Sequence, residues 1–140
     1  PGNMGTIIRT ADWFGIRQLV CSQTTVELYN PKVIQATMGS FTRVKIYYTD
    51  LESFIDNNLK ERRFLGAFLE GTPVQRFSFQ PSDVIVIGNE ANGITEAVAR
   101  KINAKILIDS PVKSTDKAES LNASIAAAIM MYQYSLSVRR

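Results

Sequence analysis

The fold is decided by one stretch of this sequence, Val84-Ile85-Val86-Ile87-Gly88-Asn89-Glu90-Ala91-Asn92-Gly93. Its first four residues are apolar and β-branched, a pattern typical of a buried parallel strand, and we expect 84–87 to be a central strand. The strand ends in Gly-Asn-Glu, which places a carboxylate and flexible backbone at the carboxyl edge of a sheet. Ligands bind at that edge in open α/β sheets, so the stretch predicts a binding site.

A second segment of the same kind follows, Ile106-Leu107-Ile108-Asp109-Ser110-Pro111. After it, a polar loop leads to Glu119-Ser120-Leu121-Asn122, where Ser120 and Asn122 are competing N-cap residues for an apolar helix. The two segments therefore indicate one ligand-binding edge.

Strands and helices alternate along the rest of the chain. Asn3 is a predicted N-cap and Gly15 a predicted helix end, while Asn30-Pro31 and the box Thr49-Asp50-Leu51-Glu52 open two further helices. Helices are predicted over 3–15, 30–39, 49–62, 95–101 and 121–137, and strands over 18–21, 44–47, 64–69, 84–87 and 105–108. This order predicts the α/β class, with a mainly parallel sheet flanked by helices.

Composition limits the class of protein. The 140 residues are 45% hydrophobic and 21% charged, which suits one globular domain over 1–140. No apolar run could span a bilayer, and the single Cys21 excludes an internal disulfide, so we expect a cytoplasmic protein with no membrane partner. The net charge of +3 is compatible with nucleic-acid binding. Because the chain opens directly on a helix, we expect a strand before Pro1 in the natural protein.

The sequence contains no histidine. This excludes Ser-His-Asp and Cys-His nucleophilic sites. With a single cysteine it also argues against zinc, and we expect no metal. Acid–base chemistry must come from Arg, Lys, Asp, Glu, Tyr or the substrate.

Three motifs stand in order along the chain: Asn3-x-Gly5-x-x-x-Arg9-x-Ala11, Ile87-Gly88-Asn89-Glu90-x-x-Gly93 and Glu119-Ser120-Leu121-Asn122-x-Ser124-x-Ala126. Taken singly, the first motif could be a helix cap with a surface arginine, the second a strand-to-helix turn, and the third a pair of N-cap residues. Together with Asn30–Ile34 and Ala36–Ser40, the chain resembles the SpoU/TrmH-type RNA 2′-O-ribose methyltransferases over essentially its whole length.

The resemblance implies a SPOUT-type α/β fold with a C-terminal deep trefoil knot. It also implies the cofactor S-adenosyl-L-methionine, a tRNA or rRNA substrate, and a homodimer. Many relatives carry an N-terminal RNA-binding domain as well, which we expect to lie outside residues 1–140. The implied cofactor-binding residues are Thr37, Met38, Gly39, Ile87, Gly88, Asn89, Ile108, Pro111 and Leu121.

The implied catalytic residues are Asn3, Arg9, Glu90, Ser120 and Asn122. In the resemblance, Arg9 acts with the adjacent RNA phosphate to assist deprotonation of the 2′-hydroxyl, and the other four orient Arg9, the ribose and the phosphate. Two features depart from the family pattern. Ala91 replaces a glycine, and the loop from Pro111 to Ser120 is longer and lacks a glycine.

Two other classes remain open. A SPOUT-like protein could bind RNA or cofactor without catalysis, although the intact motif set argues against it. A flavodoxin-like nucleotide-binding domain would require a phosphate-cradling loop after the first strand, which is absent. Candidate RNA contacts are the basic residues Arg43, Lys45, Arg62, Arg63, Arg139 and Arg140.

Overall fold

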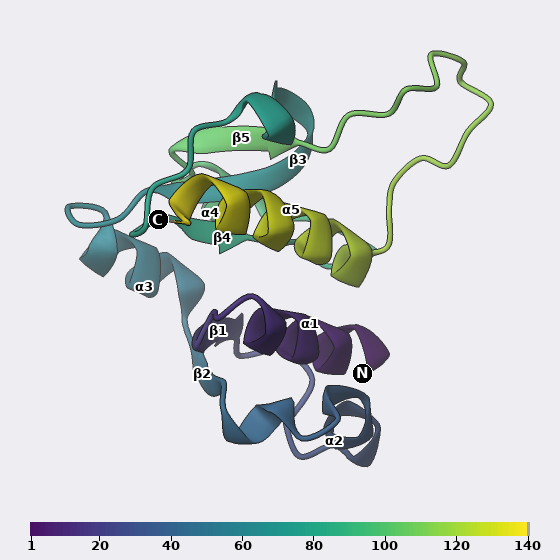
Figure 1. The fold of residues 1–140 in the computed structure, drawn as a ribbon. Helices are drawn as coiled ribbons and strands as arrows, with labels where there is room; N and C mark the ends of the chain where they lie inside the picture. Colours follow the sequence, from purple (N-terminus) through teal and green to yellow (C-terminus); the bar gives the residue numbers. More distant parts are fainter. Residues whose placement is uncertain (140) are drawn as a thin grey trace. The chain divides into compact units, whose positions relative to one another are not determined.

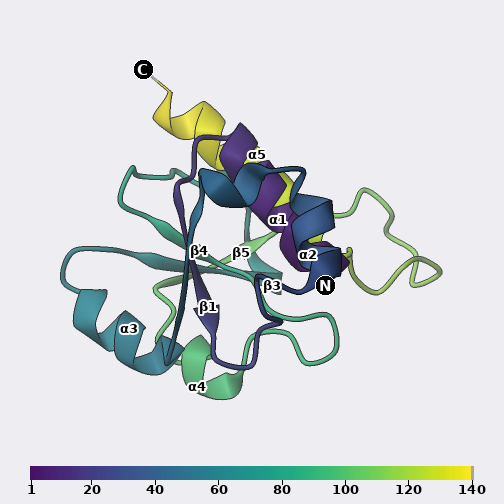
Figure 2. The ribbon, with the colours of Figure 1, turned by 90° about the horizontal axis from the view of Figure 1, so that it is seen from below.

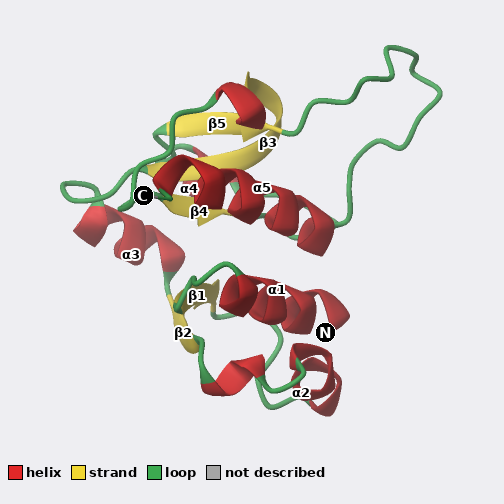
Figure 3. Cartoon of the chain, viewed as in Figure 1, coloured by secondary structure: helices red, strands yellow, loops and turns green. Residues whose placement is uncertain are grey.

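Helices alternate with strands in the computed structural model, which describes residues 1–139 (Figures 1 and 3). The helices are α1 (Gly2–Trp13), α2 (Pro31–Thr37), α3 (Leu51–Asn58), α4 (Glu96–Ala99) and α5 (Ala123–Val138), with short 3₁₀ turns η1 (Ser40–Thr42) and η2 (Val74–Arg76). The strands are β1 (Gln18–Ser22), β2 (Lys45–Thr49), β3 (Phe64–Pro73), β4 (Val84–Val86) and β5 (Ala104–Leu107). Every strand pairing in the described residues is parallel, which confirms the predicted class.

The chain divides into two compact units, Pro1–Phe54 and Ile55–Arg140, each described here by itself. No helix within 1–139 has both the length and the apolar character needed to cross a membrane. Arg140, one of the candidate RNA contacts, lies outside the described residues.

In the first unit, β1 pairs with β2 from Gln18 opposite Lys45 to Ser22 opposite Thr49. Helices α1 and α2 pack very closely, because a Cβ added to Gly5 would lie 2.3 Å from the Ala36 Cβ. The core of this unit is formed by Met4, Ile8, Cys21, Val33 and Val44.

The start of α1 differs from the prediction, and its end agrees with it. The helix begins at Gly2, so Asn3 lies inside the first turn and is not the N-cap. At the other end Gly15 has φ +76°, and the Ile16 N–H donates to the Ala11 carbonyl at 2.8 Å. This is a Schellman ending, in which glycine takes the left-handed conformation.

Helix α2 begins as predicted and ends earlier. Asn30 accepts a hydrogen bond from the Lys32 amide at 2.9 Å, and Pro31 occupies the first helical position. The helix stops at Thr37, because Met38 (φ 49°) and Gly39 (φ 85°) both adopt the left-handed conformation. These two residues form a tight turn before η1.

In the second unit the strand order is β4-β3-β5 (Figure 1). The prediction of a central strand at 84–87 is wrong for the described residues: β3 is central and β4 lies at an edge. The apolar run of β4 indicated that both of its faces are buried, which is typical of a central strand. In the structure β3 is the central strand, because it pairs with β4 on one side and with β5 on the other. Helix α5 packs on this sheet through Met130, which joins the core of Leu65, Val74, Phe79 and Ile106.

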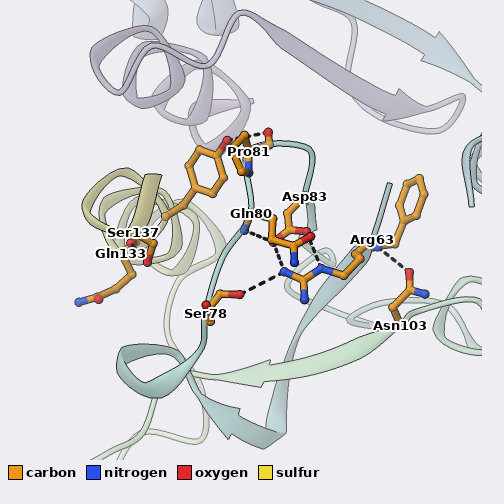
Figure 4. A network of polar contacts seen from close by, with 10 residues as sticks. Arg63, Ser78, Gln80, Pro81, Asp83, Asn103, Gln133 and Ser137 are labelled. Carbon is orange, nitrogen blue, oxygen red and sulfur yellow. Dashed lines mark hydrogen bonds and ion pairs between the residues drawn. The ribbon is translucent and has the colours of Figure 1, made fainter. Parts of the chain in front are cut away.

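A polar network fixes the connection between β3 and β4 (Figure 4). Arg63 donates through Nε and Nη2 to the two carboxylate oxygens of Asp83, at 2.8 and 2.6 Å. The Asp83 side chain has no exposed surface and also accepts from the Gln80 amide at 2.7 Å. Arg63 further donates to the Ser78 carbonyl. Arg63, expected as an RNA contact, is thus engaged in a structural ion pair.

Candidate functional site

Two of the predicted catalytic residues meet in the second unit. The Asn122 side-chain amide donates from Nδ2 to Oε1 of Glu90 at 2.8 Å. The carbonyl end of the same side chain caps α5, accepting from the backbone amides of Ser124 at 2.9 Å and Ile125 at 3.3 Å. Asn122, not Ser120, is therefore the N-cap. The second and third motifs are joined by a single side chain that is fixed at both ends.

The loop after β4 is a closed turn that leaves little space. A Cβ on Gly88 would lie 2.3 Å from the Gly93 carbonyl carbon and 2.4 Å from the Ile94 nitrogen. Asn89 accepts from the Asn92 amide at 2.7 Å, and its carbonyl accepts from the Gly93 amide at 3.0 Å. Only glycine fits at 88, and the compact turn presents Glu90 at its exposed tip.

Ala91, which departs from the family pattern, is accommodated without strain. It is exposed, and Met38 is the non-glycine residue with positive φ among the described residues. The backbone at 91 therefore does not require glycine.

The connection between β5 and α5 projects as an extended loop (Figures 1 and 2). Ile108 is half-buried, whereas Pro111, Ser120 and Leu121 are exposed. The loop has its own local contact, since Lys117 donates to the Val112 carbonyl at 2.8 Å. The structure thus brings Glu90 and Asn122 together, while Ser120 lies exposed at the end of the loop.

The first unit carries Asn3 and Arg9 on α1. Asn3 is half-buried and Arg9 is exposed. Among the described residues Arg9 has no ion pair or hydrogen-bonding side-chain partner, so its guanidinium is available to an external anion. The close contact of Gly5 with Ala36 places the first half of α1 directly against α2, which leads into the Thr37–Gly39 turn.

The turn itself combines a buried and an exposed residue. Thr37 is fully buried and its hydroxyl donates to the Ile34 carbonyl at 2.8 Å. Met38 is 68% exposed at φ 49°. A non-glycine residue in this conformation costs about 1–2 kcal/mol, and such strain concentrates at functional sites.

One charged cluster of the first unit was missed by sequence reasoning. Asp12, near the end of α1, accepts from the Ser40 hydroxyl at 2.9 Å, from Arg43 Nε at 2.8 Å and from Arg17 Nη1 at 2.6 Å. The hydrogen bond from Arg43, aided by those from Ser40 and Arg17, outweighs partial burial and lowers the pKa of Asp12 to about 2. No local pattern marks this cluster, because Ser40 and Arg43 are distant from Asp12 in sequence.

Two further features bear on chemistry in the first unit. Burial raises the pKa of the Cys21 thiol to about 11, so it stays protonated at neutral pH and is a poor nucleophile. An open concavity of about 520 Å³ contains none of the predicted cofactor residues. It is lined by Leu28, Tyr29, Phe41, Thr42, Arg43, Val44, Lys45, Ile46 and Tyr47.

Comparison with known proteins identifies the family. The sequence profile of the SpoU rRNA Methylase family matches residues 1–132. The 23S rRNA (guanosine(2553)-2′-O)-methyltransferase RlmP of Bacillus subtilis is 32% identical over 134 residues, which are 94% of this chain and 52% of that protein. The chain therefore spans about half the length of the curated relatives that it matches.

Solved structures agree. The AdoMet-bound rRNA methyltransferase from Sinorhizobium meliloti aligns with a TM-score of 0.88 and 29% identity, over 100% of this chain and 53% of that one. The SpoU methyltransferase AviRb from Streptomyces viridochromogenes, in complex with AdoMet, aligns with a TM-score of 0.84 and 25% identity, over 97% of this chain and 55% of that one. The fold and the motif resemblance are thus confirmed, and the chain belongs to the SpoU rRNA methylase family.

Proposed function

We propose that this chain is the catalytic part of an S-adenosylmethionine-dependent methyltransferase that methylates a ribose 2′-hydroxyl in tRNA or rRNA. The observation that carries the proposal is the hydrogen bond from Asn122 to Glu90, which joins the second and third family motifs. The relative from Bacillus subtilis is named as a 2′-O-methyltransferase of 23S rRNA, and two structural neighbours contain AdoMet.

The residues present fit this cofactor. The predicted binding segments offer backbone groups on tight turns, at Met38–Gly39 and in the loop that opens at Gly88, where an added Cβ would collide with backbone. Such turns present amides and carbonyls to a neutral adenosyl group. When bound, S-adenosylmethionine supplies an electrophilic methyl group on a sulfonium sulfur. The segments proposed to hold it are Thr37–Gly39, Ile87–Asn89, Ile108, Pro111 and Leu121.

The chain's own residues would prepare the acceptor. Arg9 would not act as a simple base, because a guanidinium is a poor base in proteins. It would instead bind the RNA phosphate next to the target ribose. A phosphate oxygen would then take the 2′-hydroxyl proton while the hydroxyl oxygen bonds to the methyl group and the bond from that methyl group to the sulfonium sulfur breaks. Asn3 and Glu90 would orient Arg9 and the ribose, and Ser120 and Asn122 would hold the phosphate and Glu90. Positioning of this kind can supply a large part of a rate enhancement.

The proposal also includes a second copy of the chain and other features that the described residues do not contain. Helix α5 exposes Ile125, Tyr132 and Leu136, each by 46–50%, at spacings of seven and four residues along one helical face. We assign this face to the homodimer interface. The C-terminal trefoil knot, the single catalytic domain over 1–140, a strand before Pro1 and a cytoplasmic location belong to the same proposal.

The experiment is a methyl-transfer assay on the full-length protein with labelled S-adenosylmethionine and bulk RNA, alongside a cofactor-binding titration. Wild type should bind cofactor and label RNA. Arg9→Ala should bind cofactor with unchanged affinity and lose transfer, and Arg9→Lys should retain little, because a lysine cannot form the bidentate phosphate contact. Cofactor binding without any transfer by wild type would favour the non-catalytic alternative. Full transfer by Arg9→Ala would refute its role.

A further inference from the structure

Asp12 is the centre of the most connected charged cluster in the first unit. One carboxylate oxygen, Oδ2, accepts from the buried Ser40 hydroxyl at 2.9 Å and from Arg43 at 2.8 Å. The other oxygen, Oδ1, accepts from Arg17 at 2.6 Å. The Asp12 side chain is only 14% exposed, whereas both arginines are more than half exposed. The carboxylate is thus covered by its partners.

The two oxygens of Asp12 reach different parts of the chain. Oδ1 binds Arg17, which follows α1 after a short turn, so this contact stays local. Oδ2 binds Ser40, the first residue of the 3₁₀ turn η1, and Arg43, which directly follows that turn; they come 28 and 31 residues later. Ser40 directly follows Gly39, and its side chain is almost completely buried. Contact through Oδ2 therefore fixes the C-terminal side of the Thr37–Gly39 turn to α1.

The N-terminal side of that turn is fixed to α1 by a second contact. Gly5 on α1 packs directly against Ala36, the residue before Thr37. The turn is therefore held between two anchors on the same helix. The strained conformation of Met38 needs such support, because a turn free on one side would relax towards a commoner backbone conformation.

We propose that Asp12 is a positioning residue for methyl transfer, which holds the Thr37–Gly39 turn against the helix that carries Asn3 and Arg9. The inference rests on the proposed function, since it assigns the turn to the cofactor and the helix to the RNA. Asp12 itself touches neither. Its carboxylate sets the spacing between the cofactor-binding turn and Arg9 within the first unit.

The test compares three variants of the full-length protein. Asp12→Asn removes the charge, and Ser40→Ala removes the buried donor on the Oδ2 side. Arg17→Gln is the matched control, because it removes a partner of the same carboxylate that does not reach the turn. Each is measured for S-adenosylmethionine affinity by calorimetry, for KM towards cofactor and RNA separately, and for thermal unfolding.

Asp12→Asn and Ser40→Ala should raise the cofactor Kd and KM about tenfold, the effect of losing one hydrogen bond to a charged group. The KM for RNA and the parameters of Arg17→Gln should change less than twofold. Asp12→Glu should restore part of the affinity, because its carboxylate can still reach Ser40 or Arg43. A purely structural role would lower the active fraction, and so kcat, while leaving the cofactor KM unchanged.

The outcomes separate the two proposals. If wild type binds no S-adenosylmethionine, the proposed function fails. If wild type binds it and Asp12→Asn binds equally well, or if Arg17→Gln is as impaired as Ser40→Ala, the positioning role of Asp12 is wrong and the proposed function stands.

Discussion

Asn122 has two roles that a single substitution can separate. Its Oδ1 accepts from the first amides of α5, and its Nδ2 donates to Glu90. Asn122→Asp keeps an oxygen for the cap, loses the donor, and places a second carboxylate next to that of Glu90. Asn122→Ala removes both interactions. The pair therefore distinguishes the contribution to stability from the contribution to the site.

The magnitudes follow from the contacts. An N-cap side chain contributes about 1 kcal/mol, and an aspartate retains it with a favourable helix-dipole interaction of about 0.3–1 kcal/mol. Two exposed like charges about 4 Å apart in water repel by about 1 kcal/mol, which offsets that gain. Because these two effects nearly cancel, we expect the free energy of unfolding of Asn122→Asp to stay close to that of wild type. Asn122→Ala should lose about 1 kcal/mol, a fall in Tm of about 2–4 °C.

Methyl-transfer activity should depend on the hydrogen bond from Asn122 to Glu90. Because Glu90 loses its partner in both variants, methyl transfer should fall by about ten- to a hundredfold in each, as for a lost hydrogen bond to a charged group. Thermal unfolding and a labelled methyl-transfer assay on the full-length protein provide the two measurements. Asn122→Asp with activity within twofold of wild type would show that the Glu90 contact is dispensable. Equal destabilisation of Asn122→Asp and Asn122→Ala would contradict the capping role.

Three other results are expected. Gly88→Ala should destabilise the protein by about 1–3 kcal/mol in urea unfolding and abolish cofactor binding, because the added Cβ would collide with backbone atoms. The control Gly93→Ala should lower the free energy of unfolding by only about 1 kcal/mol, because the added Cβ meets open space and only the φ of +64° is unfavourable. Lys45→Glu should weaken RNA binding uniformly across sequences and flatten its salt dependence, measured by titration at several salt concentrations, and the exposed Lys60→Glu should not. The pKa of Asp12 is about 2, against 3.8 normally, so its contacts stabilise the fold fully above about pH 4 and less as pH falls towards 2; acid unfolding of Asp12→Asn should lack this component.

The sequence was sufficient for the order and type of the strands and helices, although β3 continues to Pro73, beyond its predicted end at residue 69. The apolar runs at 84–87 and 105–108 predicted β4 and β5 within one residue, and Asn30-Pro31 predicted the start of α2, because each signal is local. The glycines of the second motif also predicted a turn after the strand. The structure confirms it, because a Cβ at Gly88 would collide with the backbone of the turn.

What could not be predicted depends on contacts distant in sequence. No local pattern distinguishes Asp12, since its partners Ser40 and Arg43 lie on another element. Arg63 belonged to a basic run, and its engagement by Asp83 depends on the path of the chain between β3 and β4. The left-handed conformation of Met38 was not predictable because methionine does not favour it.

The most direct test of the account is mass-spectrometric mapping of ribose methylation in tRNA and rRNA. It compares cells that have the full-length protein, cells that lack it, and cells that carry only Arg9→Ala. We predict that a defined 2′-O-methylated nucleotide disappears without the protein, returns with wild type, and stays absent with Arg9→Ala. An identical methylation map in all the cells would contradict the central claim that this chain transfers methyl groups to RNA ribose.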